Sequence, residues 1–371
     1  MSKVLVLLVV PATVIAFLVT VAALFALRPM SFRIGLIDAP GGRKRHSGNV
    51  PIIGGIAMFI GAMASWSLVW DSGQGLAALT VASALLVGIG AMDDRYDVPR
   101  TMRVLMQAAA ILIMVYGGGL SLGTIGNPFG FGEILLGPFA LIGTFMVAIT
   151  TINAYNLADG VDGLAGVLAA VALVAVAIVG GPHALSTAIA LTVCAAVVAF
   201  LLFNFPVRLN RSFRTFMGDA GSTFLGFVIV WVTMDICQGE NAQISPVAAL
   251  WFASIPVYDS LTCFVRRLKR GRSPFLPGRD HFHHTLERAG FGTRQKLAIL
   301  GGLQATYAAV AIVGYFVGTP DVVLFTAWSV LGLSQHAIIH SIAVRYRARL
   351  IALYRSGRIS PQAIARRNAF R

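Results

Sequence analysis

The sequence predicts an all-α, polytopic membrane protein with about eleven transmembrane helices. Its 371 residues are 57% hydrophobic and only 12% charged, whereas about 25% of the residues of a soluble globular protein are charged. Apolar stretches of roughly 20 residues, long enough to cross a bilayer as helices, recur along the whole chain. The basic residues between these stretches fall on alternate loops, which is typical of a membrane protein with a defined orientation.

The apolar stretches define the spans in chain order. The first, 4–27, is too long for a secretory signal and its basic flank follows it, so we expect a retained span. The fourth, 103–118, is short and contains Gln107. The eleven expected spans are 4–27, 52–70, 76–92, 103–118, 133–152, 163–180, 184–204, 221–236, 246–265, 298–317 and 322–344.

Charge on the connecting loops predicts the orientation. All Lys and Arg residues except Lys3 lie in alternate loops or in the tail 345–371, and loops rich in these residues face the cytoplasm. An odd number of spans then puts the N-terminus outside and the C-terminus in the cytoplasm. We therefore expect one membrane domain, 1–344, and a basic cytoplasmic tail. The opposite loops carry acids and no bases: Asp71, Glu133, Asp235, Glu240 and Asp321.

The formal net charge of +14 follows from this orientation and suits contact with anionic lipid. Nucleic-acid binding is disfavoured, because the basic residues are divided among five segments. The three cysteines, Cys194, Cys237 and Cys263, show neither a disulfide framework nor a zinc-binding spacing.

Five polar segments fall on the expected cytoplasmic face, and we expect them to form one active site. They are 28–51, 93–102, 153–162, 205–220 and 266–297. The first contains a compact cation cluster between Gly and Pro residues. Such a cluster serves equally to anchor the loop at the membrane and to bind phosphate oxygens. Its members are Arg43, Lys44, Arg45 and His46.

The second segment, MDDRYDVPR at 92–100, ends the third span with adjacent carboxylates, Asp93 and Asp94. Like charges this close repel unless a cation lies between them. Mg²⁺ prefers carboxylate and phosphate oxygens, so the pair favours a magnesium site. A solvated helix end with local Asp–Arg pairs is the alternative.

The third segment, NAYNLADGVDGLAG at 153–166, places polar residues between two apolar spans. Gly160, Gly163 and Gly166 are three residues apart, as are the polar residues of this segment. The glycines predict a helix break near 160, where a turn and a new helix would aim the polar groups into one pocket. A carboxylate inside a membrane is unfavourable by about 2.5–3.5 kcal/mol, so two acids here favour ligand binding over a plain interfacial loop. The polar residues are Asn153, Asn156, Asp159 and Asp162.

The fourth segment, NFPVRLNRSFRTFMGDAGS at 204–222, has three arginines before Asp219. The glycines beside Asp219 allow close approach of a ligand. Asp219 suits a metal ligand, the N-cap of the following span, or both.

The fifth segment, RRLKRGRSPFLPGRDHFHHTLERAG at 266–290, gathers His281, His283 and His284 beside Arg279. No cysteine or glutamate lies at a zinc-site spacing here. The segment therefore suits an anionic phosphate, and histidine can donate a proton near neutral pH. Together the five segments predict a magnesium-bound nucleotide diphosphate that meets a lipid phosphate.

The strings RKRHSGNVPIIGG, MDDRYDVP, NAYNLADGVDGLAG, NFP…FMGDAGS and SPFLPGRDHFHH follow one another over about 38–290. In this order they resemble the polyprenyl-phosphate N-acetylhexosamine-1-phosphate transferase family. The histidine segment is more similar to the WecA-type branch than to the MraY branch. Asp280 departs from that branch, in which an uncharged polar residue is expected, and this departure bears on sugar preference.

The resemblance implies a reaction. An N-acetylhexosamine-1-phosphate, with GlcNAc-1-phosphate the first candidate, would pass from a UDP-sugar to undecaprenyl phosphate with release of UMP. The product would be the first lipid-linked intermediate of a cell-envelope glycan such as the lipopolysaccharide O-antigen. Direct attack by the lipid phosphate is favoured over a covalent aspartyl intermediate, because that phosphate is largely ionised at neutral pH.

The resemblance also implies residue roles. Asn156 and Asp219 are expected to bind Mg²⁺, for which Mn²⁺ would substitute. Phe216 is expected to pack on the uracil and Asp162 to read its edge. The catalytic residues are expected to be Asp93, Asp94, Asp159, His281, His283 and His284. The other substrate-binding residues are expected to be Arg43, Lys44, Arg45, His46, Asn153, Asn204 and Arg279.

We expect a multi-pass protein of the bacterial inner membrane, with its active site on the cytoplasmic face. Its partners would be a UDP-N-acetylhexosamine, undecaprenyl phosphate and the bilayer, with no nucleic acid. The sequence is also compatible with a homodimer. The alternatives are an MraY-like phospho-MurNAc-pentapeptide transferase, a membrane prenyltransferase that uses DDRYD as a DDxxD motif, and an ion-coupled transporter. The last two are disfavoured, since the sequence shows no second acid-rich motif and no internal repeat.

Overall fold

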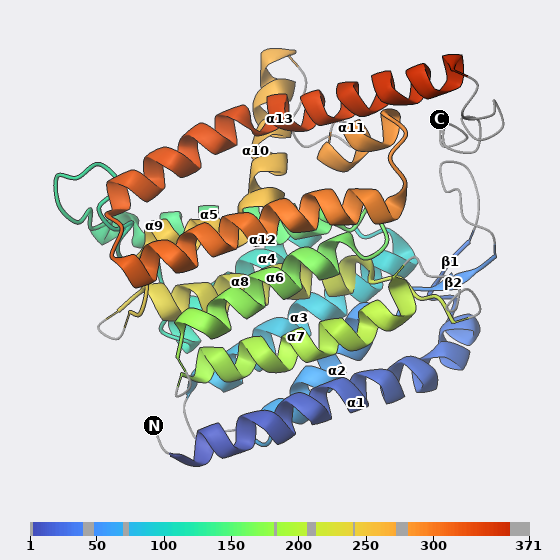
Figure 1. Ribbon diagram of the computed structural model, residues 1–371. Coiled ribbons are helices and arrows are strands. Elements are labelled where there is room, and N and C mark those ends of the chain that lie inside the picture. Colours follow the sequence, from blue (N-terminus) through green and yellow to red (C-terminus); the bar gives the residue numbers. More distant parts are fainter. Residues whose placement is uncertain are drawn as a thin grey trace.

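The computed structural model describes residues 3–39, 48–69, 74–181, 184–205, 213–239, 242–271 and 281–356. Nearly all of its regular structure is helical, so the all-α prediction is confirmed (Figure 1). The α-helices are α1 (Lys3–Ile34), α2 (Gly54–Trp66), α3 (Gln74–Tyr96), α4 (Arg100–Leu112), α5 (Ala140–Ala158), α6 (Leu164–Val179), α7 (Leu185–Asn204), α8 (Gly218–Cys237), α9 (Pro246–Ala249), α10 (Ser254–Lys269), α11 (Phe282–Arg288), α12 (Thr293–Val317) and α13 (Asp321–Arg355).

Short elements extend or join these helices. The π-helix η1 (Ile113–Gly117) continues α4, and the 3₁₀ helix η2 (Gly137–Phe139) leads into α5. A further 3₁₀ helix, η4 (Leu250–Ala253), joins α9 to α10. Strands β1 (Ile37–Asp38) and β2 (Val50–Pro51) pair antiparallel, with Ile37 opposite Pro51.

Each of the eleven expected spans coincides with a helical segment. Within the described residues, eight segments are long and apolar enough to cross a bilayer. Helices α2 and α6 are apolar but shorter, and α4 with η1 is the segment that contains Gln107. The number of crossings and the orientation of the chain stay predictions.

Most of the long helices run side by side, and α10 crosses them at a steep angle (Figure 1). The beginning of α1 and the end of α13 lie at opposite ends of the bundle. The β1–β2 pair lies at the end of the bundle where α1 and α13 finish. The charged segments that follow α3 and precede α8 belong to this same end.

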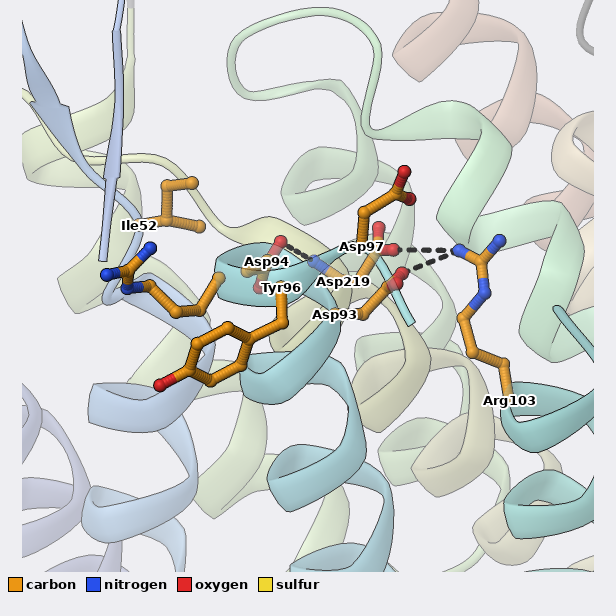
Figure 2. Close-up of a pocket in the computed structure, with 8 residues that line it drawn as sticks. Ile52, Asp93, Asp94, Tyr96, Asp97, Arg103 and Asp219 are labelled. Atoms are coloured by element: carbon orange, nitrogen blue, oxygen red, sulfur yellow. Dashed lines mark hydrogen bonds and ion pairs between the residues drawn. The ribbon is translucent and has the colours of Figure 1, made fainter. Parts of the chain in front are cut away.

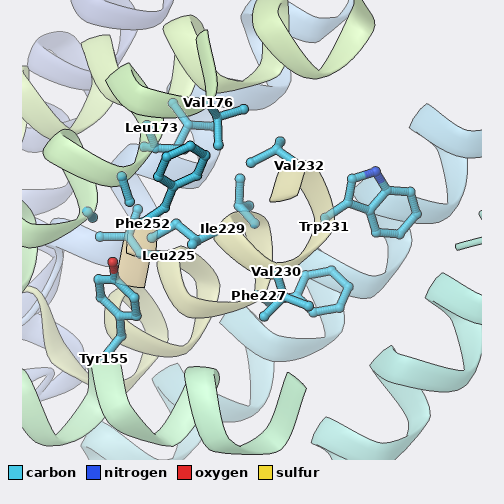
Figure 3. Close-up of a cluster of buried hydrophobic side chains, with 14 of the residues drawn as sticks. Tyr155, Leu173, Val176, Leu225, Phe227, Ile229, Val230, Trp231, Val232 and Phe252 are labelled. Atoms are coloured by element: carbon cyan, nitrogen blue, oxygen red, sulfur yellow. The ribbon is translucent and has the colours of Figure 1, made fainter. Parts of the chain in front are cut away.

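Helix α8 lies at the centre of the bundle and packs against α2, α3, α5 and α6. In its span, 89% of the residues are buried, the largest share among the eight candidate spans. Figure 3 shows its side chains, including Phe227 and Trp231, in a cluster with residues of α5, α6 and η4. Apolar composition does not by itself explain this position, since the more apolar span of α1 is only 22% buried.

Glycines bring α2 and α3 into backbone contact with the first turn of α8. A Cβ added to Gly55 of α2 would lie 2.1 Å from the backbone nitrogen of Gly221. A Cβ added to Gly90 of α3 would lie 2.4 Å from the Cα of Ala220. Small residues allow such close helix packing in membranes. These two contacts hold the segment that carries Asp219.

We predict that Gly90→Ala destabilises the protein while Gly88→Ala on the same helix does not. The methyl group at position 90 would overlap the α8 backbone, and overpacking is unfavourable by about 1–3 kcal/mol. At Gly88 no atom lies within 4 Å of an added Cβ, so the higher helix propensity of alanine leaves stability unchanged or slightly raised. Tryptophan fluorescence during heating of the detergent-purified variants measures the difference. Equal melting temperatures would mean that α3 and α8 do not touch at this point.

Candidate active site

A pocket of about 720 Å³ opens at the end of α3 (Figure 2). Most of its lining comes from the last residues of α3 and the turn that follows. Single residues from the segment after β2, from α4 and from α8 complete it. The expected acid pair and the expected metal ligand on α8 therefore line one pocket. The lining residues are Ile52, Asp93, Asp94, Arg95, Tyr96, Asp97, Arg103 and Asp219.

The turn after α3 folds back on Asp93. One carboxylate oxygen accepts a hydrogen bond of 2.7 Å from the backbone N–H of Val98, and the other accepts one of 2.6 Å from Nη1 of Arg103 on α4. Asp97 has a φ of 53°, a left-handed conformation that Asp tolerates better than most residues. This turn places Arg103 of α4 beside the acid pair.

Asp94 caps a helix other than its own. Its carboxylate accepts hydrogen bonds from the backbone N–H groups of Asp219, at 2.9 Å, and Ala220, at 3.3 Å. These N–H groups belong to the first turn of α8 and have no partner within the helix. The expectation that Asp219 caps α8 is wrong, because α8 begins at Gly218 and the capping carboxylate comes from α3.

Gly218 makes this cap possible. Its φ of 73° is one that L side chains rarely adopt, and an added Cβ would lie 2.4 Å from Oδ2 of Asp94. Both observations require glycine at this position. The Asp219 side chain, inside the first turn, is thereby left to face the pocket (Figure 2).

The two residues expected to bind metal are in contact. Nδ2 of Asn156 on α5 donates to Oδ1 of Asp219 at 2.7 Å and lies 3.0 Å from Oγ of Ser222. Oδ2 of Asp219 lies 3.3 Å from Nη1 of Arg103. The guanidinium of Arg103 thus bridges Asp93 and Asp219. From the sequence, Arg103 was expected only to contribute to the positive charge that orients the chain.

The helix break expected near 160 is present. Helix α5 ends at Ala158 and α6 begins at Leu164, after Gly163 with a φ of 78°. The N–H of Gly163 donates to Oδ1 of Asn204 at 2.6 Å, and Nδ2 of Asn204 donates to the carbonyl of Thr215 at 2.8 Å.

Asn204 differs from its expected role. The residue is 4% exposed, and both ends of its amide bind within the protein. In the structure Asn204 joins the α5–α6 turn to the segment before α8, which is a structural task rather than a substrate contact. Asn153 likewise donates to Oε1 of Gln107 at 3.0 Å and to the Ile149 carbonyl, so it binds α4 rather than the acid cluster.

Asp159 adds a fourth carboxylate beside the pocket. Burial, followed by the neighbouring charges of Asp219, Asp94 and Asp162, raises the pKa of Asp159 well above its ordinary value. A backbone hydrogen bond from Gly218 acts in the opposite direction. The α5–α6 turn thus places Asp159 close enough to Asp94 of α3 and Asp219 of α8 for their negative charges to act on it.

Asp162 forms an ion pair with Arg214. The guanidinium of Arg214 lies 4.8 Å from the centroid of the Phe216 ring, a cation–π arrangement. Asp162 and Phe216, both expected to bind the uracil, therefore meet around one arginine. Arg214 was missed from the sequence for the same reason as Arg103, since both belong to the general excess of basic residues.

The histidine segment forms the short helix α11, with His281 immediately before it. His283 is buried and lies against the α5–α6 turn, since a Cβ on Gly160 would be 3.1 Å from its Nε2. The rings of His281 and His283 are nearly parallel, with centroids 5.7 Å apart. Nδ1 of His284 lies 3.3 Å from Oε2 of Glu287. The histidines thus reach the turn that bears Asp159.

The two inner histidines have opposite charge preferences. Burial lowers the pKa of His281, but bonds to Asp259 and Cys263 outweigh it and raise that pKa to about 10. Burial and the neighbouring cations His284, His281 and Lys296 lower the pKa of His283. At neutral pH the segment therefore presents a charged ring next to a neutral one.

The fold also brings together residues that show no metal-binding spacing in the sequence. Donor atoms of Asp259, Cys263 and His281 all lie within 4.8 Å of one another, and all three residues are buried. Asp259 gives no signal in the sequence, because it is an isolated acid in an apolar span. Five of the expected substrate-binding residues lie outside the described residues: Arg43, Lys44, Arg45, His46 and Arg279.

Comparisons with known proteins identify the family of the chain. Residues 76–236, which include the acid pair, the α5–α6 turn and α8, match the family described as Glycosyl transferase family 4. An undecaprenyl-phosphate alpha-N-acetylglucosaminyl 1-phosphate transferase of Escherichia coli (strain K12) is 38% identical over 304 residues, which cover 81% of this chain and 82% of that protein.

Proteins with the same name occur in two further organisms. The protein of Salmonella typhi is 36% identical over 299 residues, 80% of this chain and 81% of its own length. The protein of Haemophilus influenzae is 34% identical over 321 residues, 85% of this chain and 90% of its own length.

We predict that Asp159→Asn stabilises the metal-free protein at neutral and alkaline pH. Above the ordinary pKa of an Asp carboxyl, the folded protein keeps a proton that the unfolded chain has released, so stability falls as pH rises toward the raised pKa. Asparagine removes this titration. Thermal unfolding in EDTA at about pH 5 and about pH 8 should show a smaller loss in the variant, by on the order of 2–4 °C.

The matched control is Glu133→Gln, which removes an exposed carboxylate outside the pocket. Its melting temperature should keep the pH response of the wild type. An identical pH response of Asp159→Asn and wild type would place Asp159 outside the acid cluster.

Proposed function

The chain belongs to glycosyl transferase family 4, and from this membership we propose that it transfers GlcNAc-1-phosphate from UDP-GlcNAc to undecaprenyl phosphate. UMP is the second product. The three relatives described above carry this activity in their names, and the chain aligns with 81–90% of their lengths. None of the three relatives is named as an MraY-like enzyme, a prenyltransferase or a transporter. The product is the first lipid-linked intermediate of a cell-envelope glycan such as the O-antigen.

The observation that carries the proposal is the meeting of four polar segments in and beside one pocket. The acid pair on α3 binds the first turn of α8, Asn156 on α5 binds Asp219, and His283 lies against the α5–α6 turn. These segments supply carboxylates, an amide and imidazoles at one end of an apolar bundle. That set suits the binding of two phosphorylated substrates, one of them anchored in lipid.

The reaction needs little covalent work from the protein. An oxygen of the lipid phosphate attacks the phosphorus that carries the sugar, and the bond from that phosphorus to the oxygen of UMP breaks. The electron pair leaves with UMP. Because the lipid phosphate is largely ionised at neutral pH, the protein has chiefly to align two anions and offset their repulsion.

A divalent cation fits the oxygen-rich pocket. Asp93, Asp94 and Asp219 line it, the charges of Asp94 and Asp219 act on Asp159, and the guanidinium of Arg103 bridges Asp93 and Asp219. We propose that Asp219 and Asn156 hold Mg²⁺, which Mn²⁺ can replace. When bound, the ion neutralises charge on the diphosphate and on the departing phosphate.

The residues of the chain have separate tasks in this proposal. Asp94 keeps α8 in place through its backbone N–H groups, so that Asp219 faces the substrates. Phe216 and Asp162 bind the uracil, for which Arg214 has to leave one face of the Phe216 ring or share the ring with the base. His281 supplies a positive charge toward the diphosphate, and neutral His283 a hydrogen bond.

The protein spans a membrane many times. We propose that this is the bacterial inner membrane, with the pocket on the cytoplasmic face, where the loops carry nearly all the basic residues. The undecaprenyl chain then lies in the bilayer and the UDP-sugar arrives from the cytoplasm. A monomer and a homodimer are equally compatible with this arrangement.

The test is UMP release by the purified protein with undecaprenyl phosphate and Mg²⁺. UDP-GlcNAc, UDP-GalNAc and UDP-MurNAc-pentapeptide are offered in parallel, each with and without EDTA. We expect UMP only from UDP-GlcNAc, only with the lipid, and not in EDTA. Release from UDP-MurNAc-pentapeptide alone would identify an MraY-like enzyme. A folded protein that releases UMP from none of the three would refute the proposal.

We predict that Asp219→Asn lowers kcat by on the order of 10²–10³-fold, since it removes the charge of a group that stabilises the transition state. Asn keeps the shape of Asp, so the melting temperature should stay close to that of the wild type. Asp235→Asn on the same helix is the control and should keep full turnover. Wild-type kcat in Asp219→Asn would remove Asp219 from the metal site.

A further inference from the structure

One carboxylate ties the histidine helix to α10. Oδ2 of Asp259 lies 3.1 Å from Nδ1 of His281, and Oδ1 accepts a 2.8 Å hydrogen bond from the backbone N–H of Phe282. Asp259 is 7% exposed, His281 4% and Phe282 1%. Both oxygens of a buried acid are therefore committed to the beginning of α11.

We propose that Asp259 is a positioning residue, which holds His281 by Nδ1 so that the ring presents Nε2, as a cationic donor, to the anionic substrates. The proposal rests on the function proposed above. In the described part of the chain, Nε2 of His281 makes no hydrogen bond, whereas Nδ1 contacts Asp259 and Cys263. The partner of one imidazole nitrogen determines which atom is free to act and how the ring is oriented.

Asp259 influences the pocket indirectly, because it fixes the position of α11. The ring of His281 lies parallel to that of His283, and His283 contacts the α5–α6 turn at Gly160. Phe282 and Leu286, on the other side of the helix, are buried in the main hydrophobic cluster. Because α11 has only seven residues, a shift at its first turn moves all of it relative to Asp159.

The charged and titratable groups around His281 come from four helices. In the described part of the chain, Asp259 is the one carboxylate at bonding distance. Nη2 of Arg266 lies 3.8 Å from Cys263 Sγ, the charge of Lys296 acts on His283, and the charges of Asp259 and Arg266 act on His336. The groups are Asp259, Cys263 and Arg266 of α10, His283 and His284 of α11, Lys296 of α12 and His336 of α13. Asp259 therefore contributes most to the positive charge of His281, with a smaller contribution from Cys263.

A metal bound by Asp259, Cys263 and His281 is the competing interpretation of the same cluster. Two observations favour the ion pair. The oxygens of Asp259 already bind His281 and Phe282, and the guanidinium of Arg266 lies beside the thiol of Cys263, where it would repel a cation. The two interpretations differ in the effect of Cys263→Ala, which removes a metal ligand but leaves the ion pair.

The kinetic test is Asp259→Asn, which keeps an oxygen for the Phe282 N–H and removes the charge. We expect kcat for UMP release to fall by about 10–100-fold. The loss should be larger at about pH 8 than at about pH 6, because without Asp259 the His281 ring keeps its proton only in acid. The double variant Asp259→Asn/His281→Gln should be no slower than His281→Gln alone, since Asp259 acts through His281.

Asp235→Asn should retain wild-type turnover and pH dependence, and Cys263→Ala should retain turnover at neutral pH because it leaves the Asp259–His281 ion pair in place. A loss in Asp259→Asn that is equal at both pH values, or that adds to the loss in His281→Gln, would overturn the proposal in favour of a general packing role. A loss in Cys263→Ala, matched by a metal found in the purified wild type, would replace the ion pair by a metal site.

Nitrogen NMR of protein labelled with ¹⁵N-histidine tests the pair without substrates. His281→Gln assigns the His281 signals among the 7 histidines. In the wild type at about pH 8, both ring nitrogens of His281 should carry protons, because the free imidazole pKa of about 6.5 is shifted upward. A neutral ring there would overturn the proposal. If the wild type turns over no donor while the ring is charged, the proposed reaction fails but the Asp259–His281 pair stands.

Discussion

The mutual repulsion of carboxylates at one end of an apolar bundle is the constraint on which the site depends. Asp94 is offset by two N–H groups of α8, Asp93 and Asp219 by one guanidinium, and Asp219 further by the amide of Asn156. Each of these groups comes from a different helix. The acids therefore hold α3, α4, α5 and α8 together at the place where the substrates would meet.

The apolar packing makes that arrangement possible. Helix α8 is buried along nearly its whole length, and two glycines let α2 and α3 touch its backbone at the first turn. A larger residue at either position would separate Asp94 from the N–H groups that it caps. Packing in the bundle and polar contacts in the pocket are thus two aspects of one helix crossing.

The sequence predicted features that local patterns encode. Runs of apolar residues located every long helix, and three glycines located the break between α5 and α6. The contact of Asn156 with Asp219 followed from a resemblance between motifs. Arg103, Arg214 and Asp259 escaped notice because each acts across the fold and has a more general explanation in the sequence. Local sequence offered Asp219 as one candidate for the N-cap of α8, and it could not reveal that the capping carboxylate comes from α3.

Asp94 and the N–H of Asp219 are 125 residues apart in the chain. The cap can therefore form only late in synthesis, after α8 has been made. At about 5–20 residues per second of synthesis, α3 exists for roughly 6–25 s before α8 emerges from the ribosome. During that interval water and the arginines of the same segment are available to neutralise the acid pair. Because these carboxylates lie at the end of α3 and not at its middle, they can stay in contact with water until α8 is synthesised and its N–H groups bind Asp94.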